Sequence, residues 1–261
     1  MNILEEIIAH KRKEVEKQKV SMRAGQLEKF GFFNEPSLSL KAALGDKNKS
    51  GIIAEFKRQS PSKGIINATA DVFAVTAGYT AAGASGLSIL TDAHFFGGSI
   101  DDLIKARINR IPLLRKDFII DEYQLIEAKA IGADVVLLIA ACLSAGEVQR
   151  LAARSKQLGM EVLLEIHDEQ EMEHICDEVD LIGVNNRNLK TFSVDLEQSV
   201  RLAEKIGAGK PRIAESGIHD PADIRHLQQH GFNGFLIGER FMREADPCAA
   251  LRAFVEKLRT I

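Results

Sequence analysis

The sequence predicts a (β/α)8 barrel of the TIM type with an N-terminal helical extension. From Gly51 onward, a short run of apolar and β-branched residues, a polar strand end and a segment with helical periodicity follow one another eight times. Strands that alternate with helices form a parallel sheet, and eight units over about 210 residues match a closed barrel in size. The expected strands are 51–57, 86–92, 111–117, 133–140, 161–166, 181–187, 211–217 and 234–239.

An open, doubly wound sheet is the alternative architecture. That fold predicts a glycine-rich GxGxxG turn after an early strand, and the sequence has none there. Helical segments fit between the expected strands, at 121–131, 145–158, 196–206 and 221–230. Several helices are followed by a glycine suited to a left-handed cap, namely Gly83, Gly132, Gly159, Gly207 and Gly231.

The first 50 residues form the expected extension. Residues 3–19 predict an amphipathic helix that must pack against another part of the molecule. Its stripe consists of Leu4, Ile7, Ile8, Lys11 and Val15. A second apolar cluster at residues 38–44 predicts a short helix. We expect residues 1–261 to form a single barrel domain, of which residues 1–50 are the extension.

Composition describes an ordinary globular protein, with 45% hydrophobic and 27% charged residues and a net charge of −3. This charge provides no basic field for nucleic acid or an anionic membrane. The N-terminus carries Glu5 and Glu6 among its apolar residues, so it lacks the apolar core of a signal peptide. We therefore expect a cytoplasmic monomer, or at most a weak dimer, whose partner is a small molecule.

Cysteines and histidines do not predict a metal site. Cys142, Cys176 and Cys248 are widely spaced without a CxxC motif, which favours reduced, mostly buried thiols. The histidines form no HExxH motif, and we expect them at the surface. His226 and His230, although four residues apart, fall on a helix far from the polar strand ends. We expect no metal and no cofactor.

The first strand changes character abruptly at its carboxyl end. Three apolar residues lead directly into Glu55 and Lys57, whose side chains share one face because alternate strand residues point the same way. The loop that follows contains Ser60, a proline and a glycine, so it ends the strand and exposes its last residues. This pattern predicts one wall of an active site or, alternatively, a surface ion pair at a sheet edge.

The other expected strands also end in polar residues, and in a barrel all carboxyl ends meet at the catalytic face. The alternation of side chains along each strand predicts that three cations and three carboxylates point into the barrel at this face. Buried charges are tolerable when they are paired, whereas isolated buried charges are not. Barrels also bury polar layers for packing, but this set is larger than packing requires. The inward set is Glu55, Lys57, Lys116, Glu165, Asn185, Arg187 and Glu215, whereas Arg115 and Asp117 should face the helices.

Two further strand ends indicate a phosphate site. The seventh strand is followed by Ser216 and Gly217, and the eighth by Gly238 and Glu239 before a helix expected near Arg240. Backbone N–H groups at a helix start, beside a glycine that allows close approach, form an anion site after strands seven and eight. A glycine before a helix is also compatible with a plain turn.

Six motifs follow one another at these strand ends: EFKRQSPSKG, LLRKDFIIDEYQ, EVLLEIHDEQE, IGVNNRNL, IAESGI and FLIGERFM. Together they resemble the indole-3-glycerol phosphate synthase family of tryptophan biosynthesis, from the N-terminal helix to the last helix. The resemblance implies conversion of 1-(2-carboxyphenylamino)-1-deoxyribulose 5-phosphate to indole-3-glycerol phosphate, with loss of carbon dioxide and water. It also implies that the N-terminal helix packs at the catalytic rim. The chain ends after one final helix, so we expect a monofunctional enzyme.

The resemblance implies roles for particular residues. The catalytic set is Glu55, Lys57, Lys116, Glu165, Asn185 and Ser216. The phosphate surround is Lys57, Arg187, Ser216, Gly217, Gly238 and Glu239. Phe96 flanks the anthranilate ring, and Ser60, Leu137 and Glu215 complete the substrate-binding set. The family often has a serine where this chain has Glu239, a change that a backbone donor survives and a side-chain contact to phosphate does not.

Two other functions remain open at this point. A Schiff-base sugar-phosphate aldolase would use Lys57 or Lys116 as its nucleophile. A non-catalytic sugar-phosphate-binding barrel is also possible, although the chain retains every proposed acid and base. For ring closure, Lys116 is our choice of proton donor to the ketone oxygen. The sequence leaves open how Glu55, Lys57 and Glu165 divide the acid and base roles of the dehydration.

Overall fold

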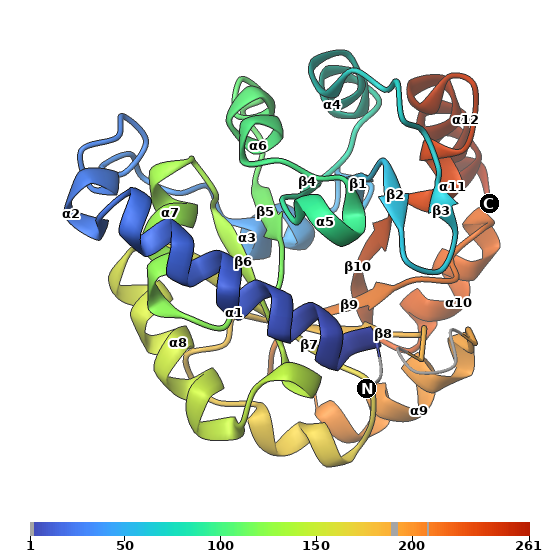
Figure 1. The fold of residues 1–261 in the computed structure, drawn as a ribbon. Helices are drawn as coiled ribbons and strands as arrows, with labels where there is room; N and C mark the ends of the chain where they lie inside the picture. The colour runs from blue at the N-terminus through green and yellow to red at the C-terminus, as the bar shows by residue number, and fades with distance from the viewer. Residues whose placement is uncertain (1–2, 189–192, 208) are drawn as a thin grey trace.

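The computed structural model describes residues 3–188, 193–207 and 209–261. Eight parallel strands form a closed barrel in which each pairs with the next along the chain and the last pairs with the first, which confirms the predicted fold (Figure 1). They are β1 (Ile52–Phe56), β4 (Gly86–Leu90), β5 (Leu113–Lys116), β6 (Val135–Ile139), β7 (Glu161–Ile166), β8 (Leu181–Asn185), β9 (Arg212–Glu215) and β10 (Phe232–Ile237). Leu189, the last residue of the IGVNNRNL motif, lies outside the described residues.

Most strands are shorter than the predicted runs. Lys57, Asp117 and Arg187 follow their strands rather than end them, so they belong to the loops at the carboxyl ends of the strands. The last strand begins and ends two residues earlier than expected. A register shift near Asn233 lengthens its start, and Gly238, with φ −122° and ψ −68°, ends it.

Helices surround the barrel in Figure 1, and the four predicted segments all occur as helices. The outer helices are α4 (Val72–Ala81), α6 (Ile100–Ala106), α7 (Glu122–Ala130), α8 (Ala145–Gln157), α9 (Leu196–Ile206), α10 (Pro221–Gln229) and α12 (Pro247–Thr260). The 3-10 helix η2 (Gln170–His174) replaces a regular helix between β7 and β8. The five predicted cap glycines all have positive φ, but Gly207 combines it with a ψ of 174°, which lies outside the left-handed helical region.

Short elements lie around the carboxyl ends of the strands, and of these the sequence predicted only the helix near Arg240. The two-residue strands β2 (Gln59–Ser60) and β3 (Gly64–Ile65) form an antiparallel hairpin directly after β1, so Ser60 lies in a strand and not in an irregular loop. Helix α5 (Ala93–Phe96) follows β4, and α11 (Glu239–Met242) follows β10. Each of these elements brings a candidate residue to the rim.

The extension contacts both ends of the barrel. Helix α1 (Ile3–Ser21) crosses in front of the strands in Figure 1 and buries Ile7, Lys11 and Val15, as the predicted stripe requires. After the short helix α2 (Ala24–Leu27), helix α3 (Leu40–Gly45) reaches the opposite end. There Leu40 and Leu44 join the apolar cluster inside the barrel, beside the first residues of the strands. The extension is therefore part of the core as well as of the rim.

Alternation along β1 shows how the barrel positions its site. Ile52, Ala54 and Phe56 pack in the apolar shell between strands and helices, whereas Ile53 belongs to the inner cluster. Glu55 has the same parity as Ile53 and therefore points inward. Among the described residues, no helix has both the length and the apolar character needed to cross a membrane. The three cysteines are free and half-buried.

Candidate active site

One cavity at the carboxyl ends of the strands collects every residue that the sequence predicted for the site. Strand ends, the β2–β3 hairpin and the first residues of α1 line it together. The predicted residues around it are Glu55, Lys57, Ser60, Phe96, Lys116, Leu137, Glu165, Asn185, Arg187, Glu215, Ser216, Gly217, Gly238 and Glu239.

Lys116 lies at the centre of a buried charge cluster. Its Nζ is 2.8 Å from Glu165 Oε2 and 3.2 Å from Glu215 Oε2. Asn185 donates a hydrogen bond of 3.1 Å to the other oxygen of Glu165. The side chain of Lys116 is 16% exposed and both carboxylates are 2% exposed, so the ammonium is the accessible member of the cluster. Burial alone would lower the pKa of Lys116, but the neighbouring carboxylates raise it above its ordinary value.

The two carboxylates of this cluster differ in charge. Burial favours the neutral form of Glu165, but Lys116 and His167 outweigh it and hold the pKa of this carboxyl well below its ordinary value. Burial, together with the nearby Glu165 and Glu55, raises the pKa of Glu215 to about 7 despite the attraction of Lys116. At neutral pH the cluster therefore contains an ammonium, an ionised carboxylate and a carboxyl near its titration point, which is a set suited to proton transfer.

Glu55 of β1 and Lys57, which follows it, form a second ion pair in the cavity. Lys57 Nζ is 2.6 Å from Glu55 Oε1, and Ser88 donates a hydrogen bond of 3.3 Å to the other oxygen of Glu55. The Glu55 side chain is 3% exposed, so this is not a surface ion pair at a sheet edge. Gly238 makes room for it, because a Cβ at that position would lie 2.5 Å from Glu55 Oε1.

The loops after β8, β9 and β10 form the other end of the cavity. Arg187 lies there, with its backbone N–H donating to the side chain of Asn185. Ser216 has φ +66°, and among the residues that the structure describes it is the non-glycine residue with positive φ. Asn186 holds this conformation by donating a hydrogen bond of 3.1 Å to the Ser216 carbonyl. Such sparsely populated backbone conformations gather at functional sites.

Glu239 differs from the other predicted residues in its contacts. It starts α11, one residue earlier than expected, with Gly238 as the N-cap. Its carboxylate is 3.6 Å from Arg187 and 3.8 Å from Lys63. The acidic side chain of Glu239 therefore faces the cations at this end of the cavity. Only the backbone N–H of Glu239 is suited to bind an anion.

The expected surface position is wrong for two histidines. His174 is buried, and His167 is largely buried, with its ring nitrogens 3.3 Å from Glu165 and 3.4 Å from Glu171. Burial would lower the pKa of His167, but these carboxylates raise it to about 10. Sequence parity could have found this residue, because His167 stands two positions after Glu165.

Sequence reasoning found Phe96 and Leu137 of the apolar part of the cavity but missed Phe118. Phe118 lines it beside Phe96, with ring centroids 6.0 Å apart. Ile3, Leu4 and Ile7 of α1 contribute to the same wall, so the amphipathic helix does pack at the rim. A charged centre between an aromatic end and an end with a guanidinium and strained backbone defines a (β/α)8-barrel enzyme for a small anionic molecule with an apolar part.

Comparisons with known proteins identify the family. A family model described as indole-3-glycerol phosphate synthase matches residues 4–254. A protein of that name from Bacteroides thetaiotaomicron is 51% identical over 259 residues, covering 98% of this chain and 99% of the relative. A relative of the same name from Koribacter versatilis is 43% identical over 256 residues, covering 97% and 98%. The chain belongs to the indole-3-glycerol phosphate synthase family, decarboxylating lyases of tryptophan biosynthesis, which confirms the resemblance.

A solved structure supports the fold independently. The crystal structure of tryptophan synthase subunit alpha from Legionella pneumophila superposes with a TM-score of 0.62 at 15% sequence identity. The match covers 85% of this chain and 97% of the other. At this identity the similarity shows the barrel fold alone.

Proposed function

We propose that this cavity converts 1-(2-carboxyphenylamino)-1-deoxyribulose 5-phosphate to indole-3-glycerol phosphate, with loss of carbon dioxide and water. The observation that carries the proposal is the ammonium of Lys116, held between Glu165 and Glu215 midway along the cavity. Phe96 and Phe118 then receive the aromatic ring, and the loops after β8 to β10 receive the phosphate.

Lys116 is the proposed acid of ring closure. The ring carbon that bears the carboxylate attacks the ribulose ketone, a carbon–carbon bond forms, and the ketone oxygen gains negative charge. A proton from Lys116 converts that oxygen to a hydroxyl. Loss of carbon dioxide then returns its bonding electrons to the ring and restores aromaticity.

Glu165, Lys57 and Glu55 are the proposed residues of the dehydration. The lowered pKa of Glu165 keeps it ionised, so it is suited to accept the amine proton as the hydroxyl leaves and to return a proton to the nitrogen as the adjacent ring CH2 gives one up. Lys57 is suited to donate a proton to the departing hydroxyl, which leaves as water. Glu55, 2.6 Å away, orients Lys57 for this step. Asn185 fixes the Glu165 carboxylate through its hydrogen bond.

Arg187 and the backbone N–H groups around Ser216, Gly217 and Gly238 are the proposed phosphate ligands. The positive φ values of Ser216 and Gly217 support this assignment. Ser60 lies on the hairpin above the same cavity, and Leu137 forms its floor.

A fluorescence assay of indole-3-glycerol phosphate formation from the carboxyphenylamino substrate tests the proposal. We expect turnover that requires no added metal or cofactor. A covalent adduct trapped by borohydride with a ketose phosphate would favour the aldolase instead. Tight binding of the substrate without any turnover would favour the non-catalytic barrel.

The Arg187→Ala variant should raise KM at least about tenfold while kcat changes only a few-fold. A phosphate contact is made equally in the ground state and the transition state, so its loss weakens binding rather than the chemical step. Steady-state kinetics measure both parameters. Arg201→Ala, an exposed arginine on α9, is the matched control and should leave both unchanged. A large fall of kcat at constant KM would show that Arg187 does more than bind the phosphate.

We expect kcat/KM to fall as pH rises through about 7. Glu215 is protonated below its raised pKa and ionised above it, and ionisation adds negative charge beside Glu165 in a cavity that receives an anion. A pH profile of kcat/KM reports groups of the free enzyme. The descending limb should disappear in Glu215→Gln. A limb that persists unchanged in this variant would assign the titration to another group.

We further propose that residues 1–261 work as one barrel domain, with residues 1–50 as its extension. The contacts of α1 and α3 with opposite ends of the barrel support this view. A cytoplasmic monomer, with a weak dimer as the alternative, is the proposed state. The net charge of −3 favours a small phosphorylated partner over nucleic acid.

A further inference from the structure

Lys11 is the charged residue on the buried stripe of α1. Its side chain is 1% exposed, although it lies one helical turn after Ile7, which borders the cavity. Lysines are almost never fully buried unless they are paired. A buried ammonium at this position therefore needs charged partners, which apolar packing cannot supply.

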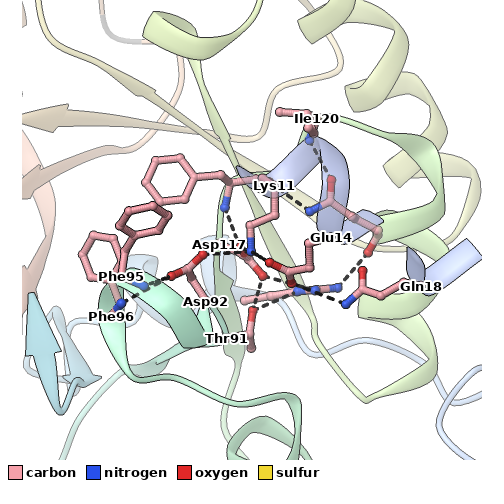
Figure 2. Close-up of polar contacts among 12 residues, drawn as sticks. Lys11, Glu14, Gln18, Thr91, Asp92, Phe95, Phe96, Asp117 and Ile120 are labelled. Atoms are coloured by element: carbon pink, nitrogen blue, oxygen red, sulfur yellow. Dashed lines mark hydrogen bonds and ion pairs between the residues drawn. The ribbon is translucent and has the colours of Figure 1, made fainter. Parts of the chain in front are cut away.

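The ammonium joins two strand ends. Lys11 Nζ is 2.9 Å from Asp92, which follows β4, and 2.9 Å from Asp117, which follows β5 (Figure 2). Glu14 of the same helix contributes a third contact of 3.0 Å. Burial would raise the pKa of Asp117, but Lys11 and Arg115 lower it to about 2, so the group is ionised.

Asp92 transmits this contact to one wall of the cavity. While one of its oxygens faces Lys11, the other accepts hydrogen bonds from the backbone N–H groups of Phe95 at 2.8 Å and Phe96 at 3.3 Å (Figure 2). Asp92 is thus the N-cap of α5, the short helix that presents Phe96 to the cavity. A shift of Asp92 would carry Phe96 with it.

Asp117 transmits the contact to the second aromatic residue, Phe118. The oxygen that faces Lys11 also accepts the backbone N–H of Phe118 at 2.8 Å. Its second oxygen accepts from Thr91 at 2.5 Å and Arg115 at 3.2 Å. Lys116 directly precedes Asp117 in the chain. One ammonium therefore links the backbones that carry both Phe96 and Phe118.

We propose that Lys11 is a positioning residue, which acts through Asp92 and Asp117 to hold Phe96 and Phe118 around the aromatic ring of the substrate. The identity of that ring rests on the proposed function. Without Lys11, Asp92 and Asp117 would lie buried on neighbouring strand ends without their shared counter-charge, and they would separate or take up water. A displacement of about 1 Å at a reacting centre is enough for roughly a hundredfold loss of rate.

The Lys11→Met variant tests this role, because methionine keeps the length and removes the charge. We expect kcat/KM to fall about 10- to 100-fold and the affinity for anthranilate, measured by its fluorescence, to fall at least about fivefold. Affinity for glycerol 3-phosphate, measured by calorimetry, should change less than about twofold, because the phosphate end does not touch this cluster. Equal loss at both ends would overturn the proposal in favour of general destabilisation.

A double variant separates positioning from packing. In Lys11→Met/Asp92→Asn, the asparagine oxygen still caps α5, and the remaining charge of Asp117 is balanced by Arg115. We expect the double variant to bind anthranilate at least about threefold more tightly than Lys11→Met does. Two independent sites would not show such coupling. No recovery would overturn the proposal.

Lys19→Met is the matched control on the same helix. Lys19 pairs with Glu16 at 3.1 Å and with Asp121, the N-cap of α7, at 2.7 Å, so it also ties α1 to the barrel but does not pair with Asp92 or Asp117. It should leave anthranilate affinity and kcat/KM unchanged. A loss equal to that of Lys11→Met would mean that docking of α1, and not Lys11, sets the site.

Two further measurements cover the cases in which Lys11→Met does not fold or the wild-type protein shows no turnover. If Lys11→Met fails to fold, Asp92→Asn alone should lower anthranilate affinity about two- to fivefold, and an unchanged affinity there would overturn the proposal. If the wild-type protein binds anthranilate but forms no indole-3-glycerol phosphate, the proposed function fails, whereas the binding comparison still decides the role of Lys11.

Discussion

In the Lys116→Met variant we expect kcat to fall at least about a hundredfold while the substrate still binds. Ring closure concentrates negative charge on one oxygen, and a single preorganised donor of this kind is worth about 3 to 4 kcal/mol. Methionine keeps the approximate length and removes the charge. The other cation near the centre, Lys57, is paired with Glu55 at 2.6 Å and is not placed between Glu165 and Glu215.

Single-turnover kinetics at saturating substrate, together with a binding titration, measure this effect. Arg115, the neighbour on the other face of β5, is a poor control because its guanidinium is buried against Asp117 and Glu127. Lys105→Met, at an exposed position of α6, is a better one and should keep normal turnover. Near-normal turnover of Lys116→Met would assign the proton to Lys57 or another group.

In Glu165→Gln we expect kcat to fall about 100- to 1000-fold. The amide cannot accept the amine proton, and general base catalysis contributes about 10²- to 10⁴-fold. The same change removes the nearest carboxylate from Lys116, which lies 2.8 Å away, and so disturbs the donor of the first step. Pre-steady-state kinetics should show slower ring closure as well as slower dehydration.

Glu161→Gln is the matched control at the other end of the same strand. Glu161 accepts hydrogen bonds from Ser39 and from the backbone N–H of Lys41, so it supports α3 far from the cavity. We expect this variant to lower Tm slightly and leave kcat unchanged. A Glu165→Gln enzyme with kcat within about tenfold of wild type would transfer the base role to Glu55.

Local periodicity explains why the sequence predicted so much of this protein. The alternation of strand and helix runs is set by side-chain periods of 2 and 3.6, which neighbouring residues determine. The same parity placed Glu55 beside Lys57 and sent Arg115 outward. The carboxyl ends of all strands in a (β/α)8 barrel meet at one face, so the residues at the predicted strand ends were also the predicted cavity residues.

Other features were decided by contacts between distant parts of the chain. The opposite placement of α1 and α3, the pairing of Lys11 with Asp92 and Asp117, and the approach of Phe118 to Phe96 have no local signal. An apolar or amphipathic stripe shows that a helix must pack, but the stripe does not specify its partner.

The sequence by itself determined the barrel, the face that carries its chemistry and the residues gathered there. Only the tertiary structure decided the protonation states of these residues. Glu165 is ionised, whereas Glu215 titrates near neutrality. The reason is that the pKa of a buried group depends on how deeply it is buried and on every charged neighbour within a few ångströms. Those neighbours come from different strands, and their distances exist only once the barrel has closed.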